Sequence, residues 1–136
     1  MSTVQDDSSL GRQRVTNAWL VPTQIKMLLN YQELEKWDLS SLRWIVYGGP
    51  RFMPRASRKR CAGIGLVFVQ TFGPGEPPMT ATYLRREDHV LVGAAAARLA
   101  SCGRARSGLE VRVLDGPDRE LPRGQGGQIC CAAPRW

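Results

Sequence analysis

The stretch LRWIVYGGP, at positions 42–50, decides the class of fold because an apolar run stops at a Gly-Gly-Pro break. Its first six residues form a nearly continuous apolar segment, as expected of a strand that is buried on both faces of a parallel sheet. Glycine and proline interrupt strands, so we expect this strand to end at Tyr47. A parallel strand needs similar neighbours elsewhere in the chain, joined to it by crossover connections.

The segments before and after this strand show the same pattern. Upstream, we expect a strand at 15–21 (VTNAWLV), followed by Pro22 at the first position of a helix, where proline is tolerated. Downstream, an apolar strand is expected at 66–71, ending in a glycine-rich turn. A short helix of poor composition is expected at 54–62. The order strand-helix-strand-helix-strand predicts an α/β fold with parallel strands and right-handed crossovers.

Beyond residue 90 the pattern changes to a β-rich one. An alanine-rich segment at 91–100 is expected to be helical, and apolar and polar residues then alternate at 109–115, as in a half-exposed strand. A turn-rich connection leads to a last strand at 127–132, which can pair with it as an antiparallel hairpin. We therefore expect an α/β fold, a partial parallel sheet with flanking helices followed by a small antiparallel β piece, preceded by a loose segment at 1–14.

Length and composition indicate one globular domain. The chain has 136 residues, of which 43% are hydrophobic, and a chain of this size can bury about two-thirds of its unfolded surface. No apolar run approaches the roughly 20 residues of a membrane span, and the polar N-terminus lacks the apolar core of a signal peptide. We therefore expect a cytoplasmic protein with no membrane span.

The cysteines do not have the spacing of a zinc site. No C-x-x-C pair is present, and His89 is the only histidine, so a tetrahedral metal centre is not expected. Cys130 and Cys131 fall in a predicted strand, where neighbouring side chains point to opposite faces and a disulfide between them would be strained. We expect reduced, partly buried thiols at the four positions Cys61, Cys102, Cys130 and Cys131.

The net charge of +7 favours anionic partners. It does not by itself distinguish nucleic acid from nucleotide, coenzyme or membrane surface. The basic residues are most frequent in RFMPRASRKR at 51–60, for which a solvated helix face is the simpler interpretation. No aromatic residue stands among the last six of these positions, and no nucleic-acid-binding module surrounds them, so we do not expect a nucleic-acid partner.

The ends of two predicted strands carry residues that suit a nucleotide. In open parallel sheets, ligands bind beyond the carboxyl ends of the strands. Those ends combine glycines that admit close backbone approach, an aromatic ring and a carboxylate. The residues are Gly48, Gly49 and Pro50 after one strand, and Phe72, Gly73, Pro74, Gly75 and Glu76 after the other. Spacing alone leaves a second interpretation open, since glycine after a strand is more often only a turn.

Three blocks of sequence resemble consecutive segments of the adenylate-forming acyl-CoA synthetase family, also called AMP-dependent synthetases and ligases. They are VTNAWLVPTQIKMLLNYQELEKWDLSSLRWIVYGGPRFMP from Val15, FVQTFGPGEPPMT from Phe68, and LASCGRARSGLEVRVLDGPDRELPRGQGGQI up to Ile129. The order and spacing of the blocks are specific to this superfamily. Within it, the resemblance is greatest to the fatty-acyl or aryl-acid CoA ligases. The resemblance implies that residues 15–136 are part of an AMP-binding (adenylation) domain.

The resemblance also implies a role for each residue of the predicted site. Phe72 to Glu76 match the family's aromatic-Gly-x-Thr-Glu motif, in which the aromatic ring stacks on adenine and the glutamate binds magnesium. Gly48, Gly49 and Pro50 match the backbone beside the adenine. The strand with Asn17 and Trp19 matches one wall of the acyl pocket. In such enzymes ATP and a carboxylic acid, fatty or aromatic, form an acyl-adenylate, which the thiol of coenzyme A then attacks.

The chain also departs from the family's pattern. Gly75 stands where the motif has threonine, which removes a hydroxyl donor to phosphate worth on the order of 1.5–3 kcal/mol. Asn17 stands where many relatives of this branch have histidine. The family's phosphate loop with its lysine is expected upstream of Val15, and a ribose-binding aspartate and the lysine of the C-terminal lid domain downstream of Trp136.

These departures leave three hypotheses about function. The first is a fragment of an acyl-CoA ligase that is inactive alone, because charged groups that stabilise the transition state are missing, unless a companion chain supplies them. The second is a non-catalytic nucleotide- or partner-binding module that reuses the fold. The third, a basic nucleic-acid binder, would show a steep salt dependence of binding.

Overall fold

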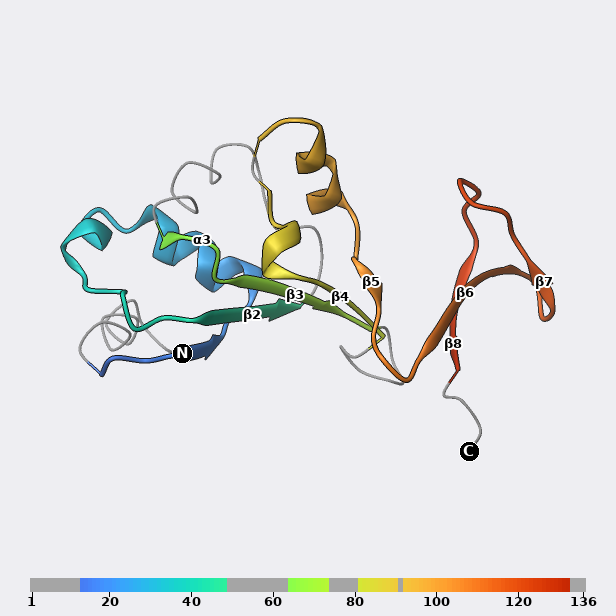
Figure 1. Cartoon of the computed structure of the whole chain (residues 1–136), viewed down its shortest axis with the longest axis horizontal. Coiled ribbons are helices and arrows are strands. Elements are labelled where there is room, and N and C mark those ends of the chain that lie inside the picture. The colour runs from blue at the N-terminus through green and yellow to red at the C-terminus, as the bar shows by residue number, and fades with distance from the viewer. Residues whose placement is uncertain (1–12, 49–63, 74–80, 91, 133–136) are drawn as a thin grey trace.

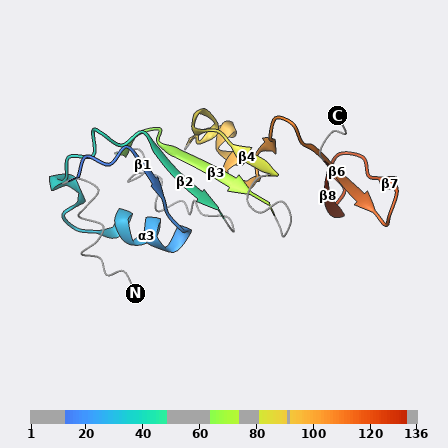
Figure 2. The same cartoon turned by 90° about the horizontal axis from the view of Figure 1, so that it is seen from below.

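The computed structural model describes residues 13–48, 64–73, 81–90 and 92–132, which form two sheets and a few helices (Figures 1 and 2). The first sheet has five strands: β1 (Asn17–Trp19), β2 (Trp44–Gly48), β3 (Phe68–Phe72), β4 (Thr82–Leu84) and β5 (Arg104–Ala105). The second has three strands: β6 (Glu110–Asp115), β7 (Arg119–Glu120) and β8 (Gln128–Ala132). The helical elements are α3 (Pro22–Asn30) and the 3-10 helices η1 (Leu34–Lys36), η3 (Arg86–Asp88) and η4 (Ala94–Ala100).

The five-stranded sheet is mixed, with strand order β1-β2-β3-β4-β5. The pairs β1–β2 and β2–β3 are parallel, which confirms the predicted parallel neighbours. β4 and β5 then continue the sheet in antiparallel pairing. The sequence did not predict these two strands, because three and two residues are too few to show an alternating pattern. The helix expected at 54–62 lies outside the described residues.

α3 begins where the sequence predicted it. Pro22 occupies the first turn, where its missing N–H costs no hydrogen bond, and the backbone N–H of Val21 donates to Oε1 of Gln24 at 3.0 Å. Ile25, Leu28 and Leu29 recur at helical spacing on one face, and each is at most 1% exposed. The helix therefore packs a narrow apolar stripe against the sheet.

The core lies between the sheet and the helical elements, because α3, η3 and η4 are all on the same side of the sheet (Figure 1). The register explains which strand residues meet there: Ala18 lies beside Ile45, and Ile45 beside Phe68. All three are buried. Leu84 of β4 and Leu99 of η4 complete this cluster with the three buried residues of α3.

The opposite face, which we call the outer face, is much less covered. It carries the alternate residues of the same strands: Asn17, Trp19, Trp44, Val46, Val69, Thr71 and Tyr83. The prediction that the strand at 42–47 is buried on both faces is therefore wrong. Ile45 and Tyr47 are buried, whereas Val46 is half-buried and Trp44 is 37% exposed. The described helices all cover one side, so the apolar run of β2 has a single buried face.

The three-stranded sheet is antiparallel, with β6 in the centre. β6 pairs with β8 from Glu110 opposite Ala132 to Leu114 opposite Gln128, which confirms the predicted hairpin, and β7 adds a third strand within its connection. The half-exposed character predicted for 109–115 is also confirmed, because polar exposed and apolar half-buried residues alternate in β6. Among the residues of this sheet, all of which are described, none is buried.

Cys102, Cys130 and Cys131 are half-buried, as expected, while Cys61 lies outside the described residues. Of the helices that the structure describes, none has the length and apolarity that a membrane crossing requires.

Candidate functional site

The carboxyl ends of β2 and β3 lie at the same edge of the sheet. Gly48, the last residue of β2, is in register with Thr71, and Phe72 and Gly73 follow directly. The Thr71 hydroxyl donates to the Tyr47 carbonyl oxygen at 3.4 Å, which ties the two strand ends together. Gly48, Phe72 and Gly73 are each partly exposed. The structure therefore brings these three predicted residues together at an accessible edge, whereas Gly49, Pro50, Gly75 and Glu76 lie outside the described residues.

The two predicted acyl-pocket residues lie apart from Phe72. Asn17 and Trp19 project to the outer face, and Trp19 is in register with Val46. Phe72 takes the other face, because it alternates with Val69 and Thr71 and follows the direction of Phe68. Asn17 Nδ2 donates to Oγ1 of Thr16 at 3.1 Å, and Trp19 is 67% exposed. β1 and the β2–β3 edge are adjacent, but their predicted site residues occupy opposite faces of the sheet.

A buried polar cluster of Tyr47, Gln70 and His89 lies on the covered side of the sheet, just before these strand ends. His89 Nδ1 is 2.7 Å from the Arg85 carbonyl oxygen, so Nδ1 carries a proton and donates it to that oxygen. Nε2 lies 3.0 Å from the Tyr47 hydroxyl oxygen and, in the neutral imidazole, accepts the hydroxyl hydrogen. Oε1 of Gln70 lies 3.5 Å from the same hydroxyl oxygen. The cluster fixes the residues that directly precede Gly48 and Thr71.

His89 is neutral at physiological pH in this environment. It is 2% exposed, and burial lowers the pKa of its imidazole below the usual 6.5. The hydrogen bond to the Arg85 carbonyl and the charges of Asp88 and Glu87 act in the opposite direction but are the smaller effects on this pKa. A neutral imidazole with its proton on Nδ1 is compatible with the contacts of the cluster.

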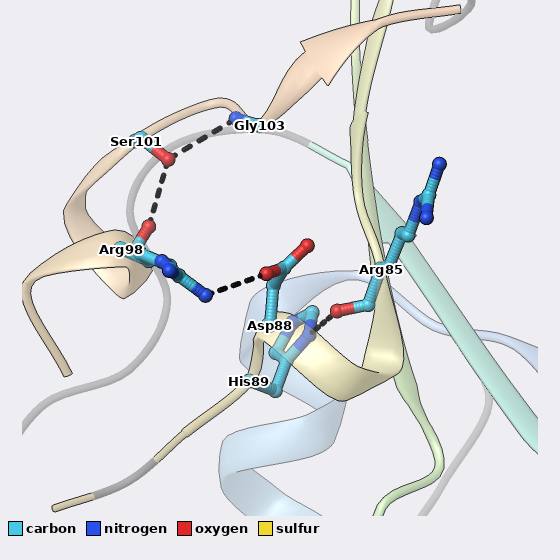
Figure 3. Close-up of polar contacts among 6 residues, drawn as sticks. All are labelled: Arg85, Asp88, His89, Arg98, Ser101 and Gly103. Carbon is cyan, nitrogen blue, oxygen red and sulfur yellow. Dashed lines mark hydrogen bonds and ion pairs between the residues drawn. The ribbon is translucent and has the colours of Figure 1, made fainter. Parts of the chain in front are cut away.

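The segment that carries His89 is held in place by polar contacts between η3 and η4 (Figure 3). Arg98 forms an ion pair with Asp88 at 2.9 Å, and the Ser101 hydroxyl donates to the Arg98 carbonyl oxygen at 2.8 Å. The Gly103 N–H donates to the same hydroxyl at 3.2 Å. Gly103 has φ +87°, and a Cβ there would lie 2.0 Å from the Tyr83 carbonyl oxygen, so only glycine fits between η4 and β5.

Sequence reasoning missed this cluster. In the sequence, His89 is distinguished only as the single histidine, and Tyr47 only as the expected end of a strand. Their contact joins positions 42 residues apart, and no spacing rule predicts it. The one available signal was a lone histidine in the polar segment that follows the third predicted strand. Because its ring nitrogens are both engaged within the core, the cluster supports the strand ends rather than offering a reactive group to solvent.

The described residues do not form a metal centre. Among them, no group of three or more His, Cys, Asp and Glu side chains is placed to hold a metal ion. Glu76, the one residue for which the family resemblance implies magnesium binding, lies outside this part of the chain.

Comparisons with known proteins agree with the fold. The AMP-binding enzyme family matches the chain over residues 5–135. The chain is 34% identical over 125 residues to the medium/long-chain-fatty-acid–CoA ligase FadD8 of Mycobacterium tuberculosis, covering 92% of this chain and 21% of that protein. It is 32% identical over 120 residues to the fatty acid–[acyl-carrier-protein] ligase ScoC of Streptomyces coeruleorubidus, covering 88% of this chain and 22% of that protein.

A solved structure gives the same result. The amide bond synthetase McbA from Marinactinospora thermotolerans superposes with a TM-score of 0.79 at 29% identity, over 97% of this chain and 26% of that one. This chain belongs to the AMP-binding enzyme family, whose members are ATP-dependent, adenylate-forming acid ligases. It spans only about a fifth of the length of the curated relatives named above.

Proposed function

We propose that this chain supplies the adenine-facing part of the adenylation site of an acyl-CoA ligase. The observation that carries the proposal is the parallel register of β2 and β3, which places Gly48 beside Thr71 and Phe72 at one accessible sheet edge. Ligands bind at the carboxyl ends of parallel strands because loops and backbone groups converge there. The two strand ends are the segments for which the family resemblance implies contact with adenine.

In this proposal the residues of the edge have distinct roles. Phe72 stacks on the adenine ring, and the glycines at 48 and 73 allow the nucleotide to approach the backbone closely. Glu76 would hold a magnesium ion, whose charge would neutralise the phosphates. The reaction joins a fatty or aromatic carboxylic acid to ATP as an acyl-adenylate with release of pyrophosphate, and the thiol of coenzyme A then displaces AMP. The setting is cytoplasmic.

The chain alone is not expected to complete this reaction. It spans 21% of FadD8 and 26% of McbA, so most of the length of such proteins has no counterpart in it. Enzymes lower reaction barriers by about 8–23 kcal/mol, and preorganised charge is a large part of that effect. A companion chain would have to supply the remaining groups.

Nucleotide binding tests the strand-end site directly. We expect the chain to bind ATP weakly, around millimolar, equivalent to about −4 kcal/mol. Phe72→Ala should weaken binding by about tenfold, because stacking on an aromatic ring is worth about 1–3 kcal/mol per base. Tyr31→Ala is the matched control: Tyr31 is also half-buried, but it follows the carboxyl end of α3, at the opposite edge of the sheet. Equal affinities of the two variants would refute the site.

Turnover is a separate measurement. Pyrophosphate release from ATP should not depend on added fatty or aromatic acids, with or without coenzyme A. Acid-dependent release above that of a Glu76→Ala control would contradict the proposed inactivity. ATP binding that depends on Phe72 without such release would agree with both parts of the proposal.

A further inference from the structure

The Tyr47 hydroxyl lies within reach of two buried acceptors near the ends of β2 and β3. His89 Nε2 is 3.0 Å from its oxygen, and Gln70 Oε1 is 3.5 Å from it. A hydroxyl bonded to an oxygen acceptor is usually about 2.7–2.8 Å from it, so the contact with Gln70 is a weak one. The hydroxyl hydrogen therefore points to His89 while its imidazole is neutral, and Gln70 is a second acceptor held close by.

This hydroxyl is closely connected to the strand ends, by which we mean Gly48 and Phe72. Tyr47 is in register with Gln70. The next pair of the same ladder is Gly48 with Thr71. The Tyr47 carbonyl oxygen also accepts the Thr71 hydroxyl at 3.4 Å. A shift of the Tyr47 side chain against that of Gln70 therefore acts on the last register pair of the two strands.

The charge of the imidazole decides which acceptor the hydroxyl can use. A neutral His89 with its proton on Nδ1 accepts at Nε2, whereas an imidazolium carries hydrogens on both nitrogens and accepts none. When His89 takes up a proton from solvent, Nε2–H must donate to the Tyr47 oxygen, and the hydroxyl hydrogen has to turn towards Gln70. The contact of 3.5 Å must then shorten, which draws the side chains of Tyr47 and Gln70 together.

The carboxylates nearest to His89 are on η3 itself. Asp88 and Glu87 both favour the imidazolium. Asp88 is paired with Arg98 of η4 at 2.9 Å (Figure 3), and Glu87 is paired with Arg86 at 3.0 Å. Because both carboxylates are already paired, they do little to offset a charge on a side chain that is only 2% exposed.

The other described elements around the ring bring no charge to it. The buried face of α3 is apolar. β2 and β3 contribute uncharged side chains, namely Tyr47, Gln70 and Phe68. The Arg85 carbonyl oxygen accepts from Nδ1 at 2.7 Å, while the Arg85 guanidinium points away from the ring (Figure 3) and lies next to Tyr83. Protonation of His89 is therefore the main change of charge in this cluster near neutral pH.

We propose that His89 is a positioning residue, which holds the strand ends in their adenine-binding form through the Tyr47 hydroxyl and does so only while its imidazole is neutral. The inference rests on the proposed function, because it treats Gly48 and Phe72 as the adenine-binding edge. When His89 becomes protonated, the hydroxyl hydrogen leaves Nε2 and the strand ends rearrange. Acid should therefore weaken nucleotide binding without a change in any residue that contacts the nucleotide.

The test follows the ring and the strand ends in the same sample of the full chain. His89 is the only histidine of the 136 residues, so its ring signals in nuclear magnetic resonance are unambiguous if no histidine tag is added. We expect the amides of Gly48 and Phe72 to shift with the same midpoint as the ring nitrogens between about pH 7.5 and 4.5. Adenosine serves as the ligand, since it has no phosphate whose own protonation would contribute. Its affinity should fall about five- to tenfold across that midpoint, as for the loss of one hydrogen bond.

Three variants test whether the hydroxyl is the link. Tyr47→Phe keeps the buried ring and removes only the hydroxyl, so His89 should still titrate while the strand-end amides and the affinity for adenosine no longer follow it. Tyr31→Phe is the matched control and should keep the coupling, since Tyr31 lies at the opposite edge of the sheet. His89→Gln provides an amide that donates and accepts without titrating, and it should bind adenosine equally at both ends of the pH range. Circular dichroism verifies that each variant folds.

Several results would overturn the inference. They are a ring that stays neutral over the whole pH range, strand-end amides that stay fixed while the ring titrates, coupling that survives Tyr47→Phe, or coupling that is lost equally in Tyr31→Phe. Loss of the far-ultraviolet dichroism at the same midpoint would also overturn it, because the effect would then be unfolding of the whole core.

A failure of the proposed function gives a different result. Adenosine then does not bind at any pH, or it binds equally well to Phe72→Ala, whereas the strand-end amides still follow the His89 ring. In that case His89 positions the strand ends, but the strand ends are not an adenine site.

Discussion

The two sheets of this molecule are held together in different ways. The five-stranded sheet packs one face against α3, η3 and η4, and Ile45, Ile25 and Phe68 there are at most 2% exposed. The three-stranded sheet has no buried residue and extends to one side in Figure 1. Its described contacts are backbone pairing, half-buried side chains and exposed ion pairs. The molecule therefore contains one sheet that packs on a hydrophobic core and one sheet that does not.

This difference indicates where the stability of the chain resides. Burial of apolar area is the dominant favourable contribution to folding, whereas exposed ion pairs contribute about 0–1 kcal/mol each. A small isolated sheet without a covered hydrophobic face is marginally stable in water. We therefore expect the five-stranded sheet to determine global unfolding, and the three-stranded sheet to open locally at a much lower free energy.

Truncation of a core side chain should show most clearly how the two sheets differ in their contribution to stability. Ile45→Ala removes a fully buried side chain and should lower the free energy of unfolding by about 2–5 kcal/mol. Val111→Ala, in the half-buried row of β6, should lower it by less than about 1 kcal/mol. Urea denaturation followed by circular dichroism measures both. Similar losses for the two variants would show that the three-stranded sheet unfolds together with the core.

A pair of glycines gives a second comparison. Gly103→Ala places a Cβ 2.0 Å from the Tyr83 carbonyl oxygen at φ +87°, and we expect a global loss of about 1–3 kcal/mol from backbone strain. Gly127→Ala places a Cβ 2.5 Å from the Leu114 carbonyl oxygen in the other sheet. Its effect should remain local. In hydrogen exchange, Gly127→Ala should accelerate only residues 110–132, and faster exchange of β2 and β3 in that variant would contradict the comparison.

Acid should affect the core through His89. The folded-state pKa of His89 is lowered by burial, so the unfolded chain takes up its proton more readily. Stability from this group is therefore complete above pH 6.5 and is lost as the pH falls below that value. His89→Gln, which cannot titrate, should show a flatter stability profile between about pH 7 and 5 than the parent chain. Parallel profiles would mean that another group controls this range.

Removal of a surface ion pair should have the smallest effect. Arg112 contacts Glu110 at 2.6 Å and Glu120 at 3.6 Å, but its side chain is 51% exposed. Arg112→Ala should lower the free energy of unfolding by less than about 1 kcal/mol, and added salt should reduce the difference further. A salt-independent loss comparable to that of Ile45→Ala would indicate that this sheet has a covered face in solution.

The sequence predicted those features of the fold that depend on local pattern. Strands at 15–21, 42–47 and 66–71 correspond to β1, β2 and β3, and Pro22 begins α3 as its position implied. β4 and β5 were missed because they form only through pairing, β4 with β3 and β5 with β4, which local pattern does not encode. The burial of β2 on one face only was missed for a related reason. An apolar run does not show whether other elements will cover one face of the strand or both.

The sequence predicted which residues of the candidate site share one edge of the sheet, but not the faces on which they lie. The strand-end rule brought Gly48 and Phe72 to one edge, and the register of β2 and β3 agrees. The rule could not assign faces, so it did not separate Trp19 from Phe72. The contact between Tyr47 and His89 depends on where η3 packs, which only the tertiary structure determines. The part of the prediction that rests on Glu76 lies outside the described residues.

The parallel connection between β2 and β3 also bears on the order in which the molecule assembles. Tyr47 and Gln70, which meet in that pairing, are 23 positions apart in the chain, whereas a short turn joins β6 to β7. Closing a longer loop costs more chain entropy before any contact forms, so non-local strand pairs form slowly. During synthesis and refolding the β6–β7 turn can therefore form early and repeatedly dissolve. Formation of the five-stranded sheet, with its crossover-linked β2 and β3, is slower and commits the chain to its native state.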